Sequence, residues 1–184
     1  MSGKYDADIL HLGCGEDYHQ DAWNVDAVPD VNPDEVYNLE ELPWPWPDNE
    51  FAVIRAYHLF EHLSDIEAAL REAHRILTPG GRLKVKVPIG IDAIADPDHE
   101  WGGGNPWTWR TPLFYTGERH WDTDVGMDVR HRDVRLWSHS PSRLTQAADR
   151  FMIDAKMFRH GPGEWCFGLP NTSGEFTVVF RNGE

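Results

Sequence analysis

The sequence has 184 residues, of which 40% are hydrophobic and 12% aromatic. These values exclude a disordered chain, and we predict a single domain over residues 1–184. The formal charge of −14, from 31 acidic and 17 basic residues, argues against a nucleic-acid partner. Abundant Asp with scarce Lys is typical of salt-loving organisms. Without a membrane-length apolar run or a signal-peptide core, we expect a cytoplasmic protein that does not bind membranes.

The first predicted strand, at residues 8–12, runs into the turn Gly13-Cys14-Gly15. Glycines without side chains allow the backbone to approach a ligand closely. The next apolar segment ends in Asp26, a carboxylate that could hold the two hydroxyls of a ribose. This pattern indicates a nucleotide site, although many such turns bind nothing. Cys14 is interpreted as a small buried side chain and not as a reactive thiol.

Further strands are predicted from β-rich runs bounded by Gly and Pro, at residues 23–26, 35–38, 51–57 and 82–87. The link between the first two strands has room for a helix of one or two turns at most. The proline-dense residues 42–48 predict a loop. Ser64 and Glu67 predict a capping box for a helix that stops at residues 78–81. Alternating strands and helices predict a mostly parallel sheet.

A long irregular insertion is predicted at residues 88–139, after the fifth strand, and it would serve as a lid or acceptor-binding segment. A helix is expected from Ser140 to about Arg150. Two final strands are expected at residues 151–158 and 175–181. Their link is short and rich in Gly and Pro, which favours an antiparallel pair. The fold class is therefore α/β, a doubly wound, seven-stranded Rossmann-like sheet.

The chain resembles the class I S-adenosylmethionine-dependent methyltransferases, especially the small type 11 domains. The likeness covers about residues 8–88. The matching segments are LGCG at 12–15, NVD at 24–26, LPWP at 42–45, DNEF at 48–51, HLFEHL at 58–63 and EAHRILTPGG at 72–81. This resemblance implies an enzyme that uses S-adenosyl-L-methionine as cofactor and methylates a small molecule or a polymer end.

The resemblance also implies a set of cofactor contacts at the ends of the strands. Gly13, Cys14 and Gly15 would lie by the methionyl part, and Asp26 by the ribose. The adenine would be held by Asn38 and Leu39, and the sulfonium would lie beside Tyr57 and His58. Because a near-neutral imidazole can remove a proton from the acceptor, His58 is the candidate general base. The alternative is that His58 only positions its loop.

Acceptor-binding residues are sought among the aromatic and polar side chains of the insertion: His99, Trp101, Trp107 and Trp109. The alternative for the tryptophans is a satellite core that ties the insertion to the sheet. Residues 58–62 also match H-x-x-E-H, a zinc-peptidase pattern, but that pattern requires a helix and here a loop is predicted. The spacing of His, Asp and Glu elsewhere supports no definite metal site.

Two further functions stay open. His11 stands where an acidic residue is common in this family, and no third glycine follows Gly15. The alternative to an enzyme is therefore a catalytically inactive binding or structural module with a methyltransferase fold. A nicotinamide-dependent oxidoreductase is the other possibility, since Asp26 suits any ribose. The proline- and tryptophan-rich loop at residues 42–48 argues against it.

Overall fold

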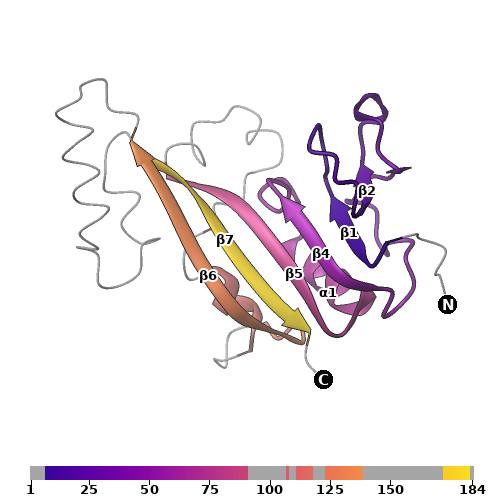
Figure 1. The fold of residues 1–184 in the computed structure, drawn as a ribbon. Helices are drawn as coiled ribbons and strands as arrows, with labels where there is room; N and C mark the ends of the chain where they lie inside the picture. Colours follow the sequence, from indigo (N-terminus) through magenta and orange to yellow (C-terminus); the bar gives the residue numbers. More distant parts are fainter. Residues whose placement is uncertain (1–6, 91–106, 108–110, 118–122, 139–171, 183–184) are drawn as a thin grey trace.

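The computed structural model describes residues 7–90, 107, 111–117, 123–138 and 172–182 (Figure 1). Seven strands form one sheet in the order β3-β2-β1-β4-β5-β7-β6. The five parallel strands are β1 (Ile9–Leu12), β2 (Trp23–Asp26), β3 (Glu35–Val36), β4 (Phe51–Tyr57) and β5 (Leu77–Gly90). β7 (Thr172–Asn182) runs antiparallel to β5 and to β6 (Met127–Ser138). The predicted mixed α/β sheet with an antiparallel final pair is confirmed.

The sixth strand differs from the prediction. β6 at Met127–Ser138 lies inside the segment that was expected to be irregular, and it pairs with β7 along its whole length. Its sequence, DVRHRDVRLW at residues 128–137, is rich in charged residues and lacks the apolar run by which the other strands were predicted. The insertion also holds the short 3-10 helix η3 (Thr111–Tyr115). The strand predicted at residues 151–158 and the helix predicted from Ser140 lie outside the described residues.

The link between β1 and β2 contains no helix, in contrast to the short crossover helix that was expected. Residues 13–22 form only turns. The side chain of Asn24 holds this link in place: its Nδ2 donates to the carbonyls of His19 and Ala22, both at 2.9 Å. Its Oδ1 accepts the backbone N–H of His19 at 3.0 Å. A buried amide thus supplies the hydrogen bonds that a helix would have made within itself.

The helix α1 (Ile66–Ile76) joins β4 to β5 and covers one face of the sheet (Figure 1). Its N-cap is Asp65, whose carboxylate accepts the N–H of Ala68 at 2.9 Å, so the predicted cap at Ser64 is wrong by one residue. Ser64 instead donates its hydroxyl to Glu40. Five apolar residues of α1 are buried against the sheet: Ile66, Ala69, Leu70, Ala73 and Ile76. Their spacing gives the apolar stripe that holds the helix on the sheet.

The proline-rich loop at residues 42–48 is confirmed as a loop, and it is fastened to α1. Trp44 and Trp46 are both buried in the core. Arg75 of α1 donates to the carbonyls of Trp44 and Trp46 at 3.0 and 2.9 Å. Glu72 accepts the backbone N–H of Trp44 at 2.7 Å. These bonds satisfy a non-repetitive backbone whose prolines cannot donate.

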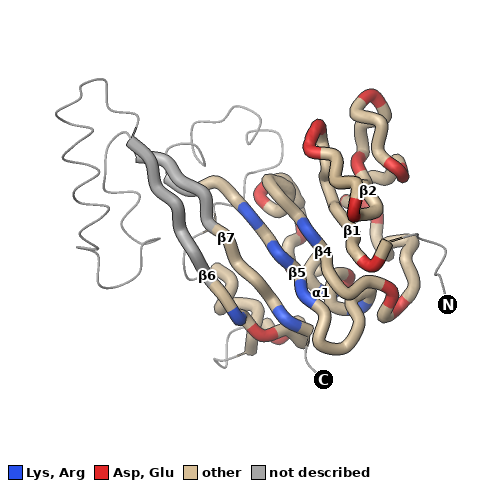
Figure 2. Tube along the Cα trace, in the orientation of Figure 1, with Lys and Arg blue, Asp and Glu red and all other residues tan. Residues whose placement is uncertain are grey.

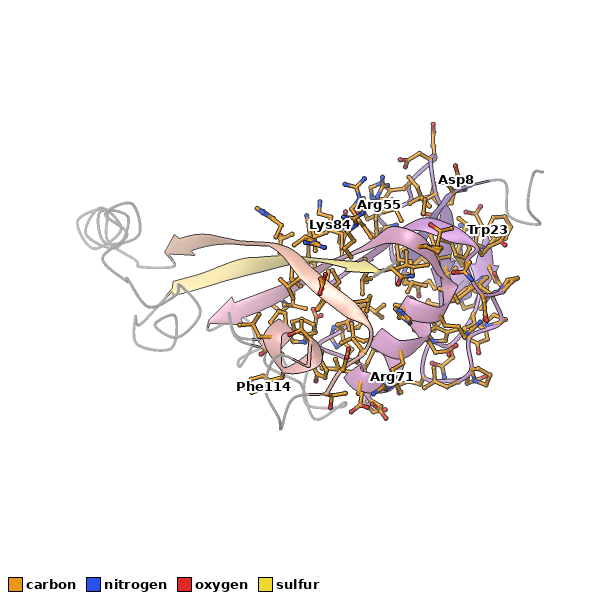
Figure 3. The ribbon with its side chains drawn as sticks, turned by 90° about the horizontal axis from the view of Figure 1, so that it is seen from below. Asp8, Trp23, Arg55, Arg71, Lys84 and Phe114 are labelled. Atoms are coloured by element: carbon orange, nitrogen blue, oxygen red, sulfur yellow. The ribbon has the colours of Figure 1, made fainter. Side chains whose placement is uncertain are left out.

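The sheet face opposite α1 is polar. Figure 3 shows Arg55 and Lys84 on that side, with Arg71 and Phe114 on the side of α1. Figure 2 shows basic positions on the central strands β4 and β5, and acidic positions in the loops around β1 and β2. None of the helices in the described ranges has the length and apolar character of a membrane span.

Candidate functional site

The glycine turn that follows β1 has the conformation that was predicted for a close approach of backbone and ligand. Gly13 and Gly15 have φ angles of 62° and 50°, which side chains disfavour. A Cβ on Gly15 would meet no atom within 4 Å, whereas one on Gly13 would meet Leu59 Cδ1 at 3.0 Å. The turn therefore opens outward at Gly15 and is closed by the loop after β4 at Gly13.

Asp26 at the end of β2 faces this turn. Its Oδ2 accepts the backbone N–H of Gly15 at 2.8 Å, and its Oδ1 accepts the N–H of Val28 at 2.9 Å. The side chain is partly exposed. Each carboxylate oxygen can accept more than one hydrogen bond, so Asp26 keeps acceptor capacity toward a ligand. This arrangement suits the diol of a ribose.

Cys14, between the two glycines, is buried. Burial raises the pKa of its thiol to about 11, and the neighbouring Asp26 carboxylate adds to this effect. The thiol therefore stays protonated near neutral pH and is a poor nucleophile. The Cys14 side chain therefore fills space inside the turn.

Asn38 and Leu39 lie in the loop after β3. The Asn38 side chain is exposed, and its Oδ1 accepts the backbone N–H of Glu40 at 3.2 Å. Leu39 is buried, and its carbonyl accepts the indole N–H of Trp44 at 3.1 Å. Trp44 thereby supports the loop that was predicted to hold the adenine.

Tyr57 and His58 stand at the carboxyl end of β4. His58 has a φ of 54°, and its backbone N–H donates to the Lys86 carbonyl at 2.8 Å. A left-handed histidine costs conformational energy and is typical of functional sites. The Tyr57 ring lies against the rings of His11 and His19, with centroids 5.5 and 6.3 Å away. That side chain therefore belongs to the polar face of the sheet.

Glu61, the acidic residue of the H-x-x-E-H pattern, is the site residue that was not predicted. Its carboxylate is buried, with Oε1 3.6 Å from His58 Nδ1. Its Oε2 has no hydrogen-bond partner among the residues that the structure describes. A buried carboxylate oxygen without a donor is costly and is retained where a ligand or a charged neighbour completes it. Glu61 follows His58 by three residues, and this spacing was the feature of the sequence from which their contact could have been predicted.

Trp107 is buried, and its ring meets Phe60 edge to face with centroids 6.0 Å apart. Within the described ranges its indole N–H has no acceptor. Trp107 thus ties the insertion to the loop after β4, as the satellite-core alternative has it. The other predicted acceptor residues, His99, Trp101 and Trp109, lie outside the described residues.

The zinc-peptidase interpretation of H-x-x-E-H does not fit the structure. His58 to His62 form turns between β4 and α1, and His62 is exposed while Glu61 is buried. The two histidines are therefore not presented on one helical face, which that motif requires.

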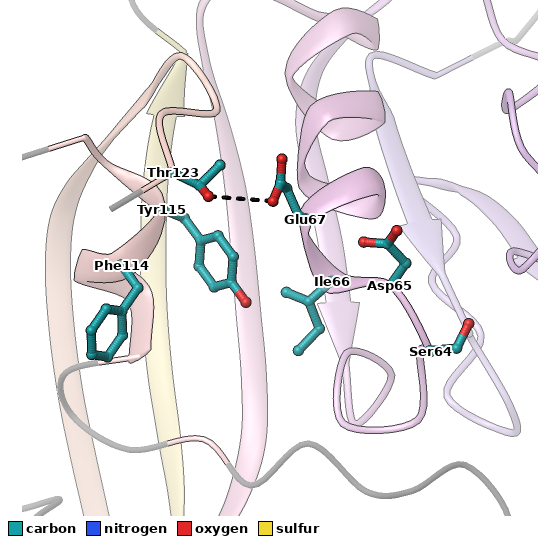
Figure 4. Close-up of a pocket in the computed structure, with 7 residues that line it drawn as sticks. All are labelled: Ser64, Asp65, Ile66, Glu67, Phe114, Tyr115 and Thr123. Carbon is teal, nitrogen blue, oxygen red and sulfur yellow. Dashed lines mark hydrogen bonds between the residues drawn. The ribbon is translucent and has the colours of Figure 1, made fainter. Parts of the chain in front are cut away.

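A pocket of about 420 Å³ lies next to this loop, between the N-terminus of α1 and η3 (Figure 4). The close-up shows Tyr115 and Ile66 facing each other across it, with Glu67 held by Thr123 Oγ1 at 3.3 Å. The carboxylate of Asp65 and the ring of Phe114 also line the pocket. It lies on the side of α1, and the glycine turn is not among its lining residues.

The comparisons with known proteins agree with this geometry. Residues 10–85 match the family described as "Methyltransferase domain". The chain is 38% identical over 71 residues to the 27-O-demethylrifamycin SV methyltransferase of Amycolatopsis mediterranei. That match covers 35% of this chain and 26% of the relative. The chain thus corresponds to about a quarter of the relative's length.

Solved structures share the fold over nearly the whole chain. One is the S-adenosylmethionine-dependent methyltransferase of Mesorhizobium loti, with a TM-score of 0.54, 15% identity and coverage of 95% of this chain and 90% of that one. Another comes from the complex between the Haloferax volcanii Trm112 methyltransferase activator and a protein described as a methyltransferase. It has a TM-score of 0.57, 16% identity and coverage of 96% and 82%. Residues 10–85 therefore match the methyltransferase domain family, and the chain has the fold of class I S-adenosylmethionine-dependent methyltransferases.

Proposed function

We propose that this chain binds S-adenosyl-L-methionine at the Gly13–Gly15 turn and catalyses transfer of its methyl group to a small-molecule or polymer-end acceptor. The observation that carries the proposal is the hydrogen bond from Gly15 N–H to Asp26, which sets an open glycine turn beside a partly exposed carboxylate. The match of residues 10–85 to the methyltransferase domain family supports the same function.

The fit of the cofactor rests on three features of this chain. The open space at Gly15 leaves room for a ligand against the backbone. The Asp26 carboxylate would accept hydrogen bonds from the ribose hydroxyls, and the Asn38 amide would hold the adenine. When bound, S-adenosylmethionine supplies an electrophilic methyl group on its sulfonium, which is open to in-line attack.

The residues after β4 would serve the acceptor. His58 removes the proton that the acceptor must lose, and the strained backbone holds its imidazole at the strand end. The buried Glu61 carboxylate, 3.6 Å from His58 Nδ1, stabilises the imidazolium that forms. Phe60 and Trp107 are buried against each other next to Glu61 in the chain, whereas the His58 side chain is 52% exposed and open to an acceptor.

Titration calorimetry with S-adenosylmethionine and S-adenosylhomocysteine tests the cofactor assignment. Saturable binding of both, followed by release of S-adenosylhomocysteine with a panel of hydroxyl, amine and carboxylate acceptors, supports the enzyme. Binding without turnover on any acceptor would favour a binding module that keeps the fold. No binding at high micromolar concentration, in buffers of low and high salt, would contradict the proposal.

The acceptor and the protein partners belong to the same proposal. The rifamycin-series relative and the Trm112 complex show that proteins similar to this chain act on a natural product or assemble with an activator protein. We include both a small-molecule acceptor and an activator protein among the partners to test. The insertion at residues 88–139, which carries Trp107, would select the acceptor.

A further inference from the structure

Three side chains with metal-ligating atoms converge on the sheet face opposite α1. One ligand atom from each of His11, Asp17 and His19 lies within 4.8 Å of the other two. The two imidazole rings meet edge to face with centroids 4.6 Å apart. His19 Nε2 lies 3.1 Å from Asp17 Oδ2. This cluster could not be predicted from residue spacing, because it forms only when the link between β1 and β2 folds back over the strand.

The hydrogen bonds around Asn24 fix the tautomer of His11. Asn24 Nδ2 donates to two backbone carbonyls, so its other side-chain atom, Oδ1, is the carbonyl oxygen. His11 Nδ1 lies 3.3 Å from that oxygen and therefore carries the ring proton. His11 Nε2 is then the nitrogen with the free lone pair. A metal-binding histidine is normally oriented in this way, by a hydrogen bond from its other nitrogen.

The burial of His11 also suits a metal ligand. The residue is 1% exposed. Its ring is held in one orientation by the hydrogen bond from Nδ1 to Asn24 Oδ1.

We propose that His11, Asp17 and His19 bind one divalent transition-metal ion, of which Zn²⁺ is the best example. Two imidazole nitrogens and one carboxylate oxygen are a donor set that such ions prefer, and three protein ligands leave a fourth position for water. With metal–ligand distances of about 2.0–2.2 Å, tetrahedral ligand atoms lie about 3.3–3.6 Å apart. Since His11 is fixed in the sheet, Asp17 and His19 of the link have to move toward it by about 1 Å.

The charges around His19 determine how easily the ion enters. Arg55 Nη1 lies 3.1 Å from His19 Nδ1 and donates to it, so Nε2 carries the ring proton that faces Asp17. Binding through Nε2 moves that proton to Nδ1, where Asp21 Oδ1 at 3.8 Å is the available acceptor. Arg55 must then withdraw from Nδ1 toward Asp21, which it already holds at 3.0 and 2.9 Å. The other cations of this face, Lys84 and Lys86, lie over the Tyr57 ring and also oppose a bound cation.

A bound ion would hold residues 13–22 against β1. In a longer link, a crossover helix packed on the sheet has this stabilising effect. The same residues begin with the Gly13–Gly15 turn. The inference goes beyond the proposed methyl transfer, and it can be tested without any acceptor or cofactor.

The test is titration of untagged, chelator-treated full chain with Zn²⁺, followed by calorimetry and by competition with a chromophoric chelator. We expect one ion per chain with a Kd of about 1 μM or below, and a rise in the unfolding temperature. The His19→Ala variant should weaken binding by more than about 100-fold and abolish the zinc-dependent rise. Co²⁺ should give the visible absorption of a tetrahedral ion with nitrogen and oxygen ligands.

Two further variants separate this site from adventitious binding. His62→Ala removes an exposed histidine outside the cluster and should bind Zn²⁺ as the parent chain does. Arg55→Gln removes the opposing cation and should bind Zn²⁺ more tightly. The proposal is overturned if no saturable binding is seen at 100-fold the expected Kd, if His19→Ala binds as well as the parent, or if His62→Ala loses the ion. Since His19 lies in the link, thermal unfolding of metal-free His19→Ala verifies that the variant folds.

Discussion

The carboxylate of Asp26 accepts the backbone N–H of Gly15 at 2.8 Å, and this bond joins the carboxyl ends of β1 and β2. A backbone N–H that lies in a left-handed turn has no strand partner, so it needs an acceptor from elsewhere. Asp26 fills this need while its side chain stays partly exposed. One residue therefore shapes the turn and, in the proposed function, also contacts the cofactor.

Replacing Asp26 should weaken cofactor binding. Asp26→Ala deletes charge-assisted hydrogen bonds, and we expect a loss of about 1.5–3 kcal/mol in the affinity for S-adenosylhomocysteine, measured by calorimetry. Asp26→Asn, which keeps an oxygen acceptor for Gly15, should preserve the fold better and lose less affinity. An unchanged affinity in Asp26→Ala would remove the residue from the site.

The two glycines of the turn should respond differently to alanine. Both have positive φ, so each substitution costs about 1–2 kcal/mol of stability from the backbone alone. Gly13→Ala also places a Cβ 3.0 Å from Leu59 Cδ1, so it should be the less stable variant in chemical denaturation. Gly15→Ala meets no protein atom, and its methyl group would enter the cofactor space. We expect the larger loss of S-adenosylhomocysteine affinity, relative to the loss of stability, in Gly15→Ala. The reverse ranking would place the cofactor elsewhere.

The first half of the chain could be predicted from its sequence because each signal there is local. The strands β1, β2 and β4 are short apolar runs, and the turn at Gly13 needs glycine whatever the rest of the chain does. β6 was missed because its alternating charges fit a solvated surface as well as a strand, and only the antiparallel ladder with β7 distinguishes the two. Pairing between Met127 and Asn182 is a long-range property.

The polar contacts could not be predicted for the same reason. His11, Asp17 and His19 come together because Asn24 folds the link over β1, which no spacing rule contains. Glu61 was visible beside His58 in the sequence, but its burial depends on the packing of the whole loop. The cap at Asp65 replaced Ser64 because Glu40 captures the Ser64 hydroxyl and backbone N–H. Local motifs thus place the elements, and side-chain competition decides their details.

His58 and Glu61 should affect turnover more than binding. His58→Asn tolerates the left-handed backbone and removes the base, and we expect kcat to fall by about 10²–10⁴-fold if the acceptor must lose a proton. The Kd for S-adenosylhomocysteine should change little. The acidic limb of the kcat–pH profile, followed by S-adenosylhomocysteine release, should disappear in this variant. A His58→Asn enzyme with the parent profile would leave His58 as a loop-positioning residue.

In Glu61→Gln, which keeps the shape of the side chain, we expect an intermediate loss of kcat.

The Glu72–Arg75 pair should make the fold sensitive to acid. Hydrogen bonds from Arg75 lower the pKa of Glu72 from its ordinary value of 4.5, against the opposing effect of burial, and the Trp44 N–H adds to the lowering. Because the pKa is lower in the folded state, the stabilisation is complete above about pH 4.5 and is lost as the pH falls through the folded value. Glu72→Gln should lose about 1–3 kcal/mol at pH 7 and show a shallower fall in unfolding free energy below pH 4.5. Asp30→Asn, at an exposed position, serves as the control. If the unfolding free energy fell with pH equally steeply in Glu72→Gln and the parent chain, Glu72 would not be the source of the acid sensitivity.

Asn182, the last residue of β7, caps α1 from across the sheet. Its Nδ2 lies 2.9 Å from the Leu77 carbonyl, 3.2 Å from that of Thr78 and 3.3 Å from that of His74. The last carbonyls of a helix have no partner within the helix. The N–H groups of Asn49 and Glu50 donate to those of Arg75 and Ile76, and Asn182 serves His74 together with Leu77, whose bond is buried, and Thr78. Asn182→Ala should therefore destabilise the fold by about 1–3 kcal/mol in urea unfolding, since it leaves a buried acceptor without a donor. Asn182→Asp keeps the size of the side chain but replaces the donor with acceptors, so it should be at least as damaging. If the aspartate variant were as stable as the parent chain, these hydrogen bonds would not be what holds the C-terminal strand to α1.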